Sequence, residues 1–223
     1  MSVDVKICGI STPEAMTAAV EGGAAFVGLV FYPPSPRAVT PEEAAPLAAL
    51  VPEEVVKTGL LVDADDATIE AILKAVPLDL LQLHGGETPE RAADIKARFG
   101  IRVMKVLKLR QESDLAAAEP FFGVVDCLLF DAKPPAEMKN ALPGGNALAF
   151  DWSILAGKTF PLPWFLAGGL TADNLAEAVR VTGAPALDIS SGVEDAPGRK
   201  NPEKIRAFLA AAQALERPAQ GPL

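Results

Sequence analysis

The residues best suited to chemistry are a thiol and a carboxyl that each lie at the end of an apolar segment. Cys8 ends the segment 5–8, and Asp131 directly follows the segment 124–130. Both segments have the length and composition of buried strands. A thiolate base and a carboxylic acid that face each other across a pocket form an acid–base pair for proton transfer. The alternatives are that Cys8 is a small buried hydrophobe and that Asp131 caps a following helix.

Neighbours on the same strand faces indicate how these two groups would work. Side chains alternate along a strand, so Lys6 shares the face of Cys8. A cation at that position is predicted to lower the pKa of the thiol, which a base near neutrality requires. Cys127 shares the face of Asp131 but lies about 13 Å down the strand, at about 3.3 Å per residue. We therefore assign Cys127 to the core.

Two turns of small residues follow the last two predicted strands, at Gly168-Gly169 and at Ser190-Ser191-Gly192. Glycine lets the backbone approach an anion closely, so that N–H groups point at it. In barrel enzymes the loops after strands seven and eight commonly bind phosphate. These turns therefore predict a phosphate site, and the alternative is a pair of ordinary tight turns.

Other polar side chains fall where they would line a pocket. Arg37 lies in a proline-rich loop, and a guanidinium held stiffly there suits a bidentate contact with a carboxylate or phosphate, although a solvent-exposed arginine is the alternative. His84 and Gln82 share one face near a strand end, where they either line the pocket or satisfy each other. Asp188 points inward and serves either the pocket or a structural hydrogen bond. Asp63 is a weaker candidate at another strand end.

Eight apolar segments alternate with helical segments and would position these groups. The predicted strands are 5–8, 26–31, 56–62, 78–83, 101–107, 124–130, 164–167 and 186–189. Strands that alternate with helices form a parallel sheet, and eight such units in one domain form a closed (β/α)8 barrel, the TIM-barrel fold. The alternative is an open doubly wound sheet. That fold usually carries its phosphate glycines after the first strand, whereas here they follow the seventh and eighth.

Helix starts are marked by a capping residue followed by proline. This pattern occurs at Thr12-Pro13, Thr40-Pro41, Thr88-Pro89 and Asn201-Pro202. We expect weaker helices at 112–118 and 150–155, and we expect Thr171 to cap the helix after the seventh strand. The whole pattern predicts one catalytic domain at residues 1–216 and a frayed tail at 217–223.

The composition limits the partners. The chain has 223 residues, a net charge of −9 and a pI near 4.7, which argues against nucleic acid but not against a small phosphorylated substrate. One histidine and two cysteines give no metal-ligand cluster, so no metal is expected. No apolar run has membrane-spanning length and no signal peptide is visible, which predicts a cytoplasmic protein without membrane contact. The oligomeric state stays open between monomer and homodimer.

In their order along the chain, these motifs resemble those of the phosphoribosylanthranilate isomerase family. The matching segments are Lys6-Ile-Cys-Gly9, Phe31-Tyr-Pro-Pro-Ser-Pro-Arg37, Gln82-Leu-His-Gly85, Leu129-Phe-Asp131, Phe150-Asp-Trp152, Leu166-Ala-Gly-Gly-Leu170, Asp188-Ile-Ser-Ser-Gly-Val-Glu194 and Pro197-Gly-Arg-Lys200. No single motif is specific, but the ordered set is, and it covers nearly the whole chain.

The resemblance implies the Amadori rearrangement of N-(5-phosphoribosyl)anthranilate to 1-(2-carboxyphenylamino)-1-deoxyribulose 5-phosphate in tryptophan biosynthesis, without cofactor or metal. By position, Asp131 matches the general acid that opens the furanose ring, and Cys8 matches the general base that removes the C2′ proton. Arg37 matches the residue that meets the anthranilate carboxylate, and Asp188 matches a pocket aspartate. The two glycine-containing turns match the family's phosphate loops.

One segment departs from the family pattern. The family often carries a Gly-Thr-Gly turn before Phe-Asp-Trp, whereas this chain has Pro-Gly-Gly-Asn-Ala-Leu-Ala at 143–149, at the end of the long irregular stretch 132–147. Loops of such length are usually functional. One alternative function is another phosphosugar barrel enzyme, and Lys105 and Lys108 would suit an indole-forming synthase. A non-catalytic phosphate-binding barrel is the other, in which the thiol and the carboxyl would be replaceable.

Overall fold

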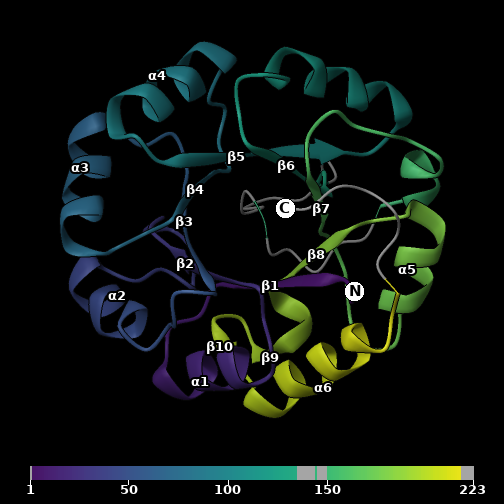
Figure 1. Cartoon of the computed structure of the whole chain (residues 1–223), viewed down its shortest axis with the longest axis horizontal. Coiled ribbons are helices and arrows are strands. Elements are labelled where there is room, and N and C mark those ends of the chain that lie inside the picture. The colour runs from purple at the N-terminus through teal and green to yellow at the C-terminus, as the bar shows by residue number, and fades with distance from the viewer. Residues whose placement is uncertain (1, 135–143, 145–149, 217–223) are drawn as a thin grey trace.

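The barrel closes in the order of the sequence. The computed structural model describes residues 2–134, 144 and 150–216. Its eight parallel strands are β1 Asp4–Cys8, β2 Phe26–Val30, β3 Val56–Leu61, β4 Leu80–Leu83, β5 Arg102–Leu109, β6 Cys127–Ala132, β7 Trp164–Leu166 and β8 Ala186–Ile189. Each strand pairs with its sequence neighbours, and β8 pairs with β1. In Figure 1 the helices form a ring around these strands, which confirms the predicted (β/α)8 fold.

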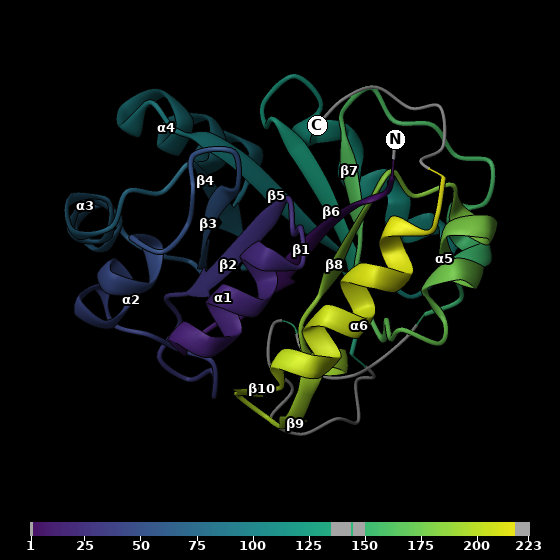
Figure 2. The same cartoon turned by 60° about the horizontal axis from the view of Figure 1, so that its bottom comes forward.

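The outer ring starts its helices largely where the capping pattern predicts. It contains α1 Pro13–Glu21, α2 Pro41–Ala48, α3 Asp66–Ala75, α4 Pro89–Phe99, α5 Leu175–Thr182 and α6 Pro202–Gln213. In α1, α2, α4 and α6 a side-chain oxygen accepts an N–H of the first turn, and a proline follows whose missing N–H costs nothing there. Figure 2 shows α1 and α6 side by side, so the first and last helices of the barrel also pack together.

The two segments expected to be weak helices are 3-10 helices. They are η1 Glu112–Phe121, which contains Pro120, and η2 Trp152–Leu155. A proline inside a helix removes one hydrogen bond and disfavours a regular α-helix. Most of the stretch 132–147 and all of the predicted tail 217–223 lie outside the described residues, so the proposed domain boundary at 216 stays a prediction.

The helix before β8 begins later than predicted. Thr171 is not its N-cap, because α5 begins at Leu175 and Asn174 occupies the capping position. The side chain of Asn174 stabilises the turn before the helix with two hydrogen bonds. Its Oδ1 accepts the N–H of Thr171 at 2.8 Å, and its Nδ2 donates to the carbonyl of Gly169 at 2.9 Å. The sequence prediction placed the cap at the wrong end of this turn.

The interior of the barrel is divided into an apolar part and a polar part. The apolar part consists of Phe26, Leu80, Met104, Val106, Cys127, Leu129, Phe165, Ala167 and Ala186. Cys127 is thus a core residue, and burial raises the pKa of its thiol to about 12. Lys6, Thr58, Gln82 and Asp188 form a buried polar set on β1, β3, β4 and β8, in which Gln82 and Asp188 lie two residues beyond Leu80 and Ala186 of the apolar part. Such a polar set is costly to bury and points to the functional end of the barrel.

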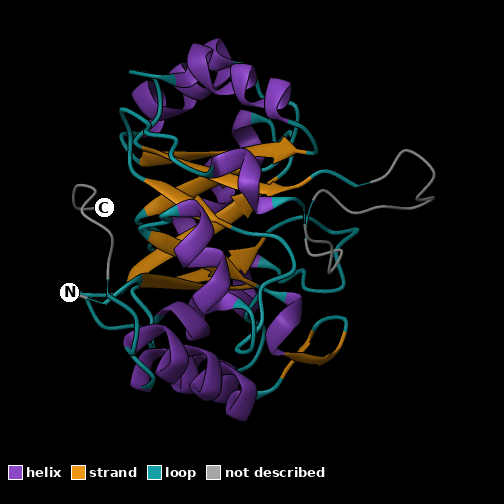
Figure 3. Ribbon diagram, turned by 90° about the vertical axis from the view of Figure 1, so that its right-hand side faces the viewer, coloured by secondary structure: helices purple, strands orange, loops and turns teal. Residues whose placement is uncertain are grey.

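A short hairpin lies beyond β8. The turn η3 Ser191–Val193 leads into β9 Glu194–Ala196, which pairs antiparallel with β10 Arg199–Lys200. In Figure 3 this hairpin lies at the end of the barrel to which the strand arrows point. It therefore shares the face on which the carboxyl ends of the strands present their side chains.

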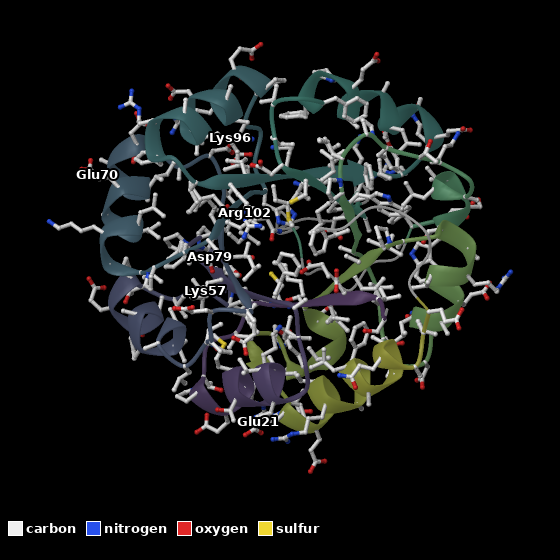
Figure 4. All side chains as sticks on the ribbon, viewed as in Figure 1. Glu21, Lys57, Glu70, Asp79, Lys96 and Arg102 are labelled. Atoms are coloured by element: carbon white, nitrogen blue, oxygen red, sulfur yellow. The ribbon has the colours of Figure 1, made fainter. Side chains whose placement is uncertain are left out.

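Ion pairs hold the strands together at the opposite end of the barrel. Asp79 accepts the backbone N–H of Lys57 at 2.8 Å and pairs with its Nζ at 3.0 Å. Arg102 reaches the carbonyl of Asp79, and the three side chains are labelled in Figure 4 together with Lys96. Lys96 pairs with Asp126 at 2.8 Å. In (β/α)8 barrels, residues at the amino ends of the strands contribute to stability, whereas the functional site lies at the carboxyl ends.

Candidate active site

One pocket at the carboxyl ends of the strands is lined by all the candidate site residues except the weaker candidate Asp63. It contains about 780 Å³ of empty space, counting the space open at its mouth. Its lining includes the ten candidates Cys8, Arg37, His84, Asp131, Gly168, Gly169, Asp188, Ser190, Ser191 and Gly192. Residues that are up to 184 positions apart in the chain therefore face one space.

Cys8 lies at the end of β1 with its thiol buried beside a lysine. Only 4% of the residue is exposed, and burial raises the pKa of the thiol. The charges of Lys6 and Lys200 act in the opposite direction, and the charge of Asp188 raises the pKa further. Lys6 thus has the expected effect on Cys8, but burial outweighs it. The thiol is protonated at neutral pH and must lose its proton before it can act as a base.

Glycine at position 28 makes room for this pair. A Cβ on Gly28 would lie 3.1 Å from the Cys8 sulfur and 3.2 Å from Nζ of Lys6. Both atoms therefore lie close to the same face of Gly28. β2 can carry only a glycine there without displacing one of them.

Lys6 and Asp188 form a buried ion pair between the first and last strands. Nζ of Lys6 lies 2.7 Å from Oδ1 of Asp188, and the lysine is completely buried. Although burial lowers the pKa of Lys6, the attraction of Asp188 and of Cys8 is larger, and the net pKa is raised. Asp188 therefore lines the pocket and also makes a structural ion pair, so both predicted alternatives describe it.

Asp131 faces His84 across the space between β6 and β4. Its Oδ1 accepts the N–H of Ala132 at 2.8 Å, and its Oδ2 lies 3.5 Å from Nε2 of His84. On the other side of the ring, Nδ1 lies 3.4 Å from the amide nitrogen of Gln82. An amide nitrogen can only donate, so the proton of a neutral His84 lies on Nε2, toward Asp131. His84 and Gln82 thus line the pocket and contact each other as well.

The turns after β7 and β8 have the close packing that their glycines allow. Gly168 and Gly169 have φ angles of 90° and 66°, a region that side-chain-bearing residues avoid. A Cβ on Gly192 would collide with the carbonyl of Leu170. The two turns therefore pack directly on one another through their backbones at one end of the pocket.

Arg37 lies at the pocket and is held by a partner that the sequence analysis did not assign. Its Nε and Nη2 each donate to Glu194, at 2.8 Å to separate oxygens. Glu194 also pairs with Lys200 at 2.6 Å. Glu194 and Lys200 belong to segments that the sequence singled out as motifs, but only the hairpin geometry reveals that Glu194 meets both Arg37 and Lys200. The weaker candidate Asp63 lies outside the pocket lining and accepts the N–H of Gly86 at 2.7 Å.

No group of three or more acidic, histidine or cysteine side chains that could hold a metal ion occurs among the described residues. In the same part of the chain no helix is both long enough and apolar enough to cross a membrane.

A closed (β/α)8 barrel with a polar pocket at the carboxyl ends of its strands is the architecture of a TIM-barrel enzyme. Within that class, the family model described as N-(5′-phosphoribosyl)anthranilate (PRA) isomerase matches residues 5–211. The chain belongs to this family.

Relatives and solved structures agree with this assignment. An N-(5′-phosphoribosyl)anthranilate isomerase of Paramagnetospirillum magneticum is 60% identical over 214 residues, covering 96% of this chain and 98% of the relative. The crystal structure of phosphoribosyl anthranilate isomerase from Thermotoga maritima has a TM-score of 0.85 at 34% identity, over 96% of this chain and 100% of that one. A structure of such an isomerase in complex with reduced 1-(o-carboxyphenylamino)-1-deoxyribulose 5-phosphate has a TM-score of 0.80 at 33% identity, with the same coverage.

Proposed function

We propose that this chain catalyses the Amadori rearrangement of N-(5-phosphoribosyl)anthranilate to 1-(2-carboxyphenylamino)-1-deoxyribulose 5-phosphate, a step of tryptophan biosynthesis. The family match over residues 5–211 supports the reaction. The observation that carries the mechanism is that Cys8 and Asp131 line the same pocket, one from β1 and the other from β6.

In this mechanism Asp131 acts first, as the general acid. Its carboxylic acid gives a proton to the ring oxygen of the ribose while the C1′–O bond breaks, so that the furanose opens to a protonated Schiff base. The carboxylate left on Asp131 accepts the N–H of Ala132 at Oδ1, and Nε2 of His84 lies 3.5 Å from Oδ2. A hydrogen bond to the charged form stabilises it, so the Ala132 N–H favours the transfer.

Cys8 acts next, as the general base. Its thiolate removes the proton from C2′, and the C2′–H electron pair moves toward the positively charged nitrogen to give an enolamine. The enolamine then tautomerises to the ketone of the product. The cations Lys6 and Lys200 favour the thiolate against the burial that opposes it. A base whose pKa lies above the working pH is a strong proton acceptor but is only rarely in its active form.

The two charged ends of the substrate fit two ends of the pocket. Arg37 would meet the anthranilate carboxylate, since a guanidinium forms directed hydrogen bonds with carboxylates. The turns Gly168-Gly169 and Ser190-Ser191-Gly192 would hold the phosphate with backbone N–H groups, because glycines permit the close approach that such contacts need. His84 and Asp188 also line the pocket.

We also propose the partners, the compartment and the assembly of the enzyme. Its partner is a small phosphorylated molecule, and neither a cofactor, a metal, a nucleic acid nor a membrane takes part. Both cysteines are free thiols, which suits a reducing cytoplasm. The assembly is a monomer or a homodimer.

An assay on freshly made N-(5-phosphoribosyl)anthranilate tests the function, with Cys8→Ala and Asp131→Asn measured beside the wild type. General acid–base roles predict a loss of at least about a hundredfold in kcat for each variant. Activity that survives both changes would exclude this mechanism. A folded wild type that binds phosphosugars but never turns this substrate over would favour another phosphosugar barrel enzyme or a non-catalytic phosphate-binding barrel.

A further inference from the structure

A cluster of three buried charged side chains lies beside the pocket, and the mechanism above uses its two cations but gives no role to its carboxylate. It consists of Arg37 after β2, Glu194 at the start of β9 and Lys200 at the end of β10. At most 5% of each side chain is exposed. The cluster contains two cations and one carboxylate, so it carries one excess positive charge at the edge of a pocket proposed to bind an anionic substrate.

The carboxylate of Glu194 is the centre of this cluster. Its Oε1 accepts both from Nε of Arg37 at 2.8 Å and from Nζ of Lys200 at 2.6 Å, and its Oε2 accepts from Nη2 of Arg37 at 2.8 Å. Nζ of Lys200 also contacts the residue that follows β8: it donates to the carbonyl of Ser190 at 2.9 Å and to the Ser190 hydroxyl at 3.1 Å. The side chains of Glu194 and Lys200 together thereby connect Arg37 with the turn that begins at Ser190.

The backbone around Glu194 reinforces this connection. Lys204 at the start of α6 donates to the Glu194 carbonyl at 2.8 Å. In the same hairpin, Gly198 packs so closely on the carbonyl of Pro36 that a Cβ would collide with it. The hairpin, which lies at the carboxyl end of the barrel in Figure 3, is thus fitted directly against the loop that carries Arg37.

Stability alone is a poor explanation for this arrangement. A buried ion pair often contributes little to stability, since desolvation of the charges opposes their attraction. What the cluster does provide is a fixed geometry between two loops that reach the pocket from β2 and β8. Both loops line that pocket, through Arg37 and Ser190.

We propose that Glu194 is a positioning residue that fixes the separation between the two anion-binding ends of the pocket. The inference rests on the proposed function, in which Arg37 meets the substrate carboxylate and the Ser190 turn meets its phosphate. A ligand that carries both a carboxylate and a phosphate benefits from the fixed separation, because once one anion is bound the other is already held next to its own binding group. A ligand that bears only one anion does not.

Titration calorimetry with three probes tests this proposal. The probes are inorganic phosphate, anthranilate, and reduced 1-(o-carboxyphenylamino)-1-deoxyribulose 5-phosphate, which carries both anions. For Glu194→Gln we expect the Kd of the two-anion probe to rise about tenfold or more, while each single-anion Kd changes less than about threefold. With the substrate itself, KM should rise more than kcat falls. Asp195→Asn is the matched control, because it makes the same change at the next residue in an exposed ion pair with Lys204, and all its values should stay unchanged.

Two further variants keep the test informative if Glu194→Gln unfolds. Glu194→Asp keeps the charge and should recover part of the two-anion affinity. Lys200→Gln breaks the ion pair while leaving Arg37 and Glu194 together, and it should weaken the two-anion probe more than anthranilate.

The contrary outcomes are distinct. An unchanged two-anion Kd, or an equal loss for all three probes, would overturn the positioning role while the wild type still turns over its substrate. A wild type that does not bind the two-anion probe would overturn the proposed function and this inference with it.

Discussion

Replacement of Lys6 by methionine should raise the pKa of the Cys8 thiol and slow the enzyme at neutral pH. The change removes the nearest cation, whose charge lowers that pKa more than any other group does. It also leaves Asp188 without its counter-ion, and that carboxylate raises the pKa. The two effects have the same sign.

The structure sets the size of this effect. A Cβ on Gly28 would touch both the sulfur and Nζ of Lys6, at 3.1 and 3.2 Å, so the two atoms are no further apart than these distances combined. A charge at about 4–6 Å shifts a pKa by about one to three units. Each unit lowers the thiolate fraction about tenfold at a pH below the pKa, so kcat/KM at pH 7 should fall by about ten- to a thousandfold if the thiolate is the base.

The rate of alkylation by iodoacetamide as a function of pH measures the thiol pKa directly. Cys127 stays silent in this assay at moderate pH because the pKa of its thiol is about 12. The double variant Lys6→Met/Asp188→Asn should show a smaller rise than Lys6→Met alone, since the opposing carboxylate is removed too. Lys57→Met breaks an ion pair at the far end of the barrel and should leave the thiol unchanged. An unaltered alkylation profile in Lys6→Met would refute the electrostatic argument.

Three further changes probe other parts of the site. Gly28→Ala should destabilise the fold by about 1–3 kcal/mol and slow turnover because its new methyl group crowds the thiol, whereas Gly86→Ala, with no contact closer than 3.7 Å, should be neutral in thermal unfolding. Lys105→Met removes the cation of the buried Glu87 carboxylate, which keeps only backbone N–H donors from Asp63 and Gly85, and it should cost about 3–5 kcal/mol in urea unfolding; a loss below about 1 kcal/mol would contradict the ion pair. Burial raises the pKa of the Glu194 carboxyl, but the cations around it have the larger effect, and the net pKa is lowered. The charged carboxylate therefore contributes to the stability of the fold above the ordinary glutamate pKa, and this contribution is lost as the pH falls through the lowered pKa. The stability gap between the wild type and Glu194→Gln should therefore narrow at acid pH in thermal unfolding, and a gap that is independent of pH would count against this assignment.

The parts of the fold that the sequence predicted well depend on local chemistry. A capping side chain and the proline after it act within one turn, so the starts of α1, α2, α4 and α6 were readable from a few neighbouring letters. The apolar strands were recognisable in the same way. Where a side chain works across a turn, as Asn174 does, the local pattern pointed to Thr171 instead.

For the candidate site, the residues could be predicted from the sequence, but the contacts between them could not. Its members were predictable because the end of each strand is marked by polar or glycine residues, and all of them except the weaker candidate Asp63 line the pocket. Their partners were not predictable, since the contacts join distant parts of the chain. Arg37 and Glu194 are 157 positions apart, and no spacing rule connects them. The pKa of Cys8 also depends on burial, which a sequence does not show.

The ion pair between Lys6 and Asp188 has a consequence for folding during synthesis on the ribosome. The two residues are 182 positions apart, so Lys6 leaves the ribosome long before its counter-ion exists. A nascent chain that closed its barrel early would enclose an uncompensated ammonium group, which is strongly unfavourable. Closure is therefore expected only after β8 has been synthesised, and a prematurely terminated chain should stay open and be recognised by proteases as unfinished.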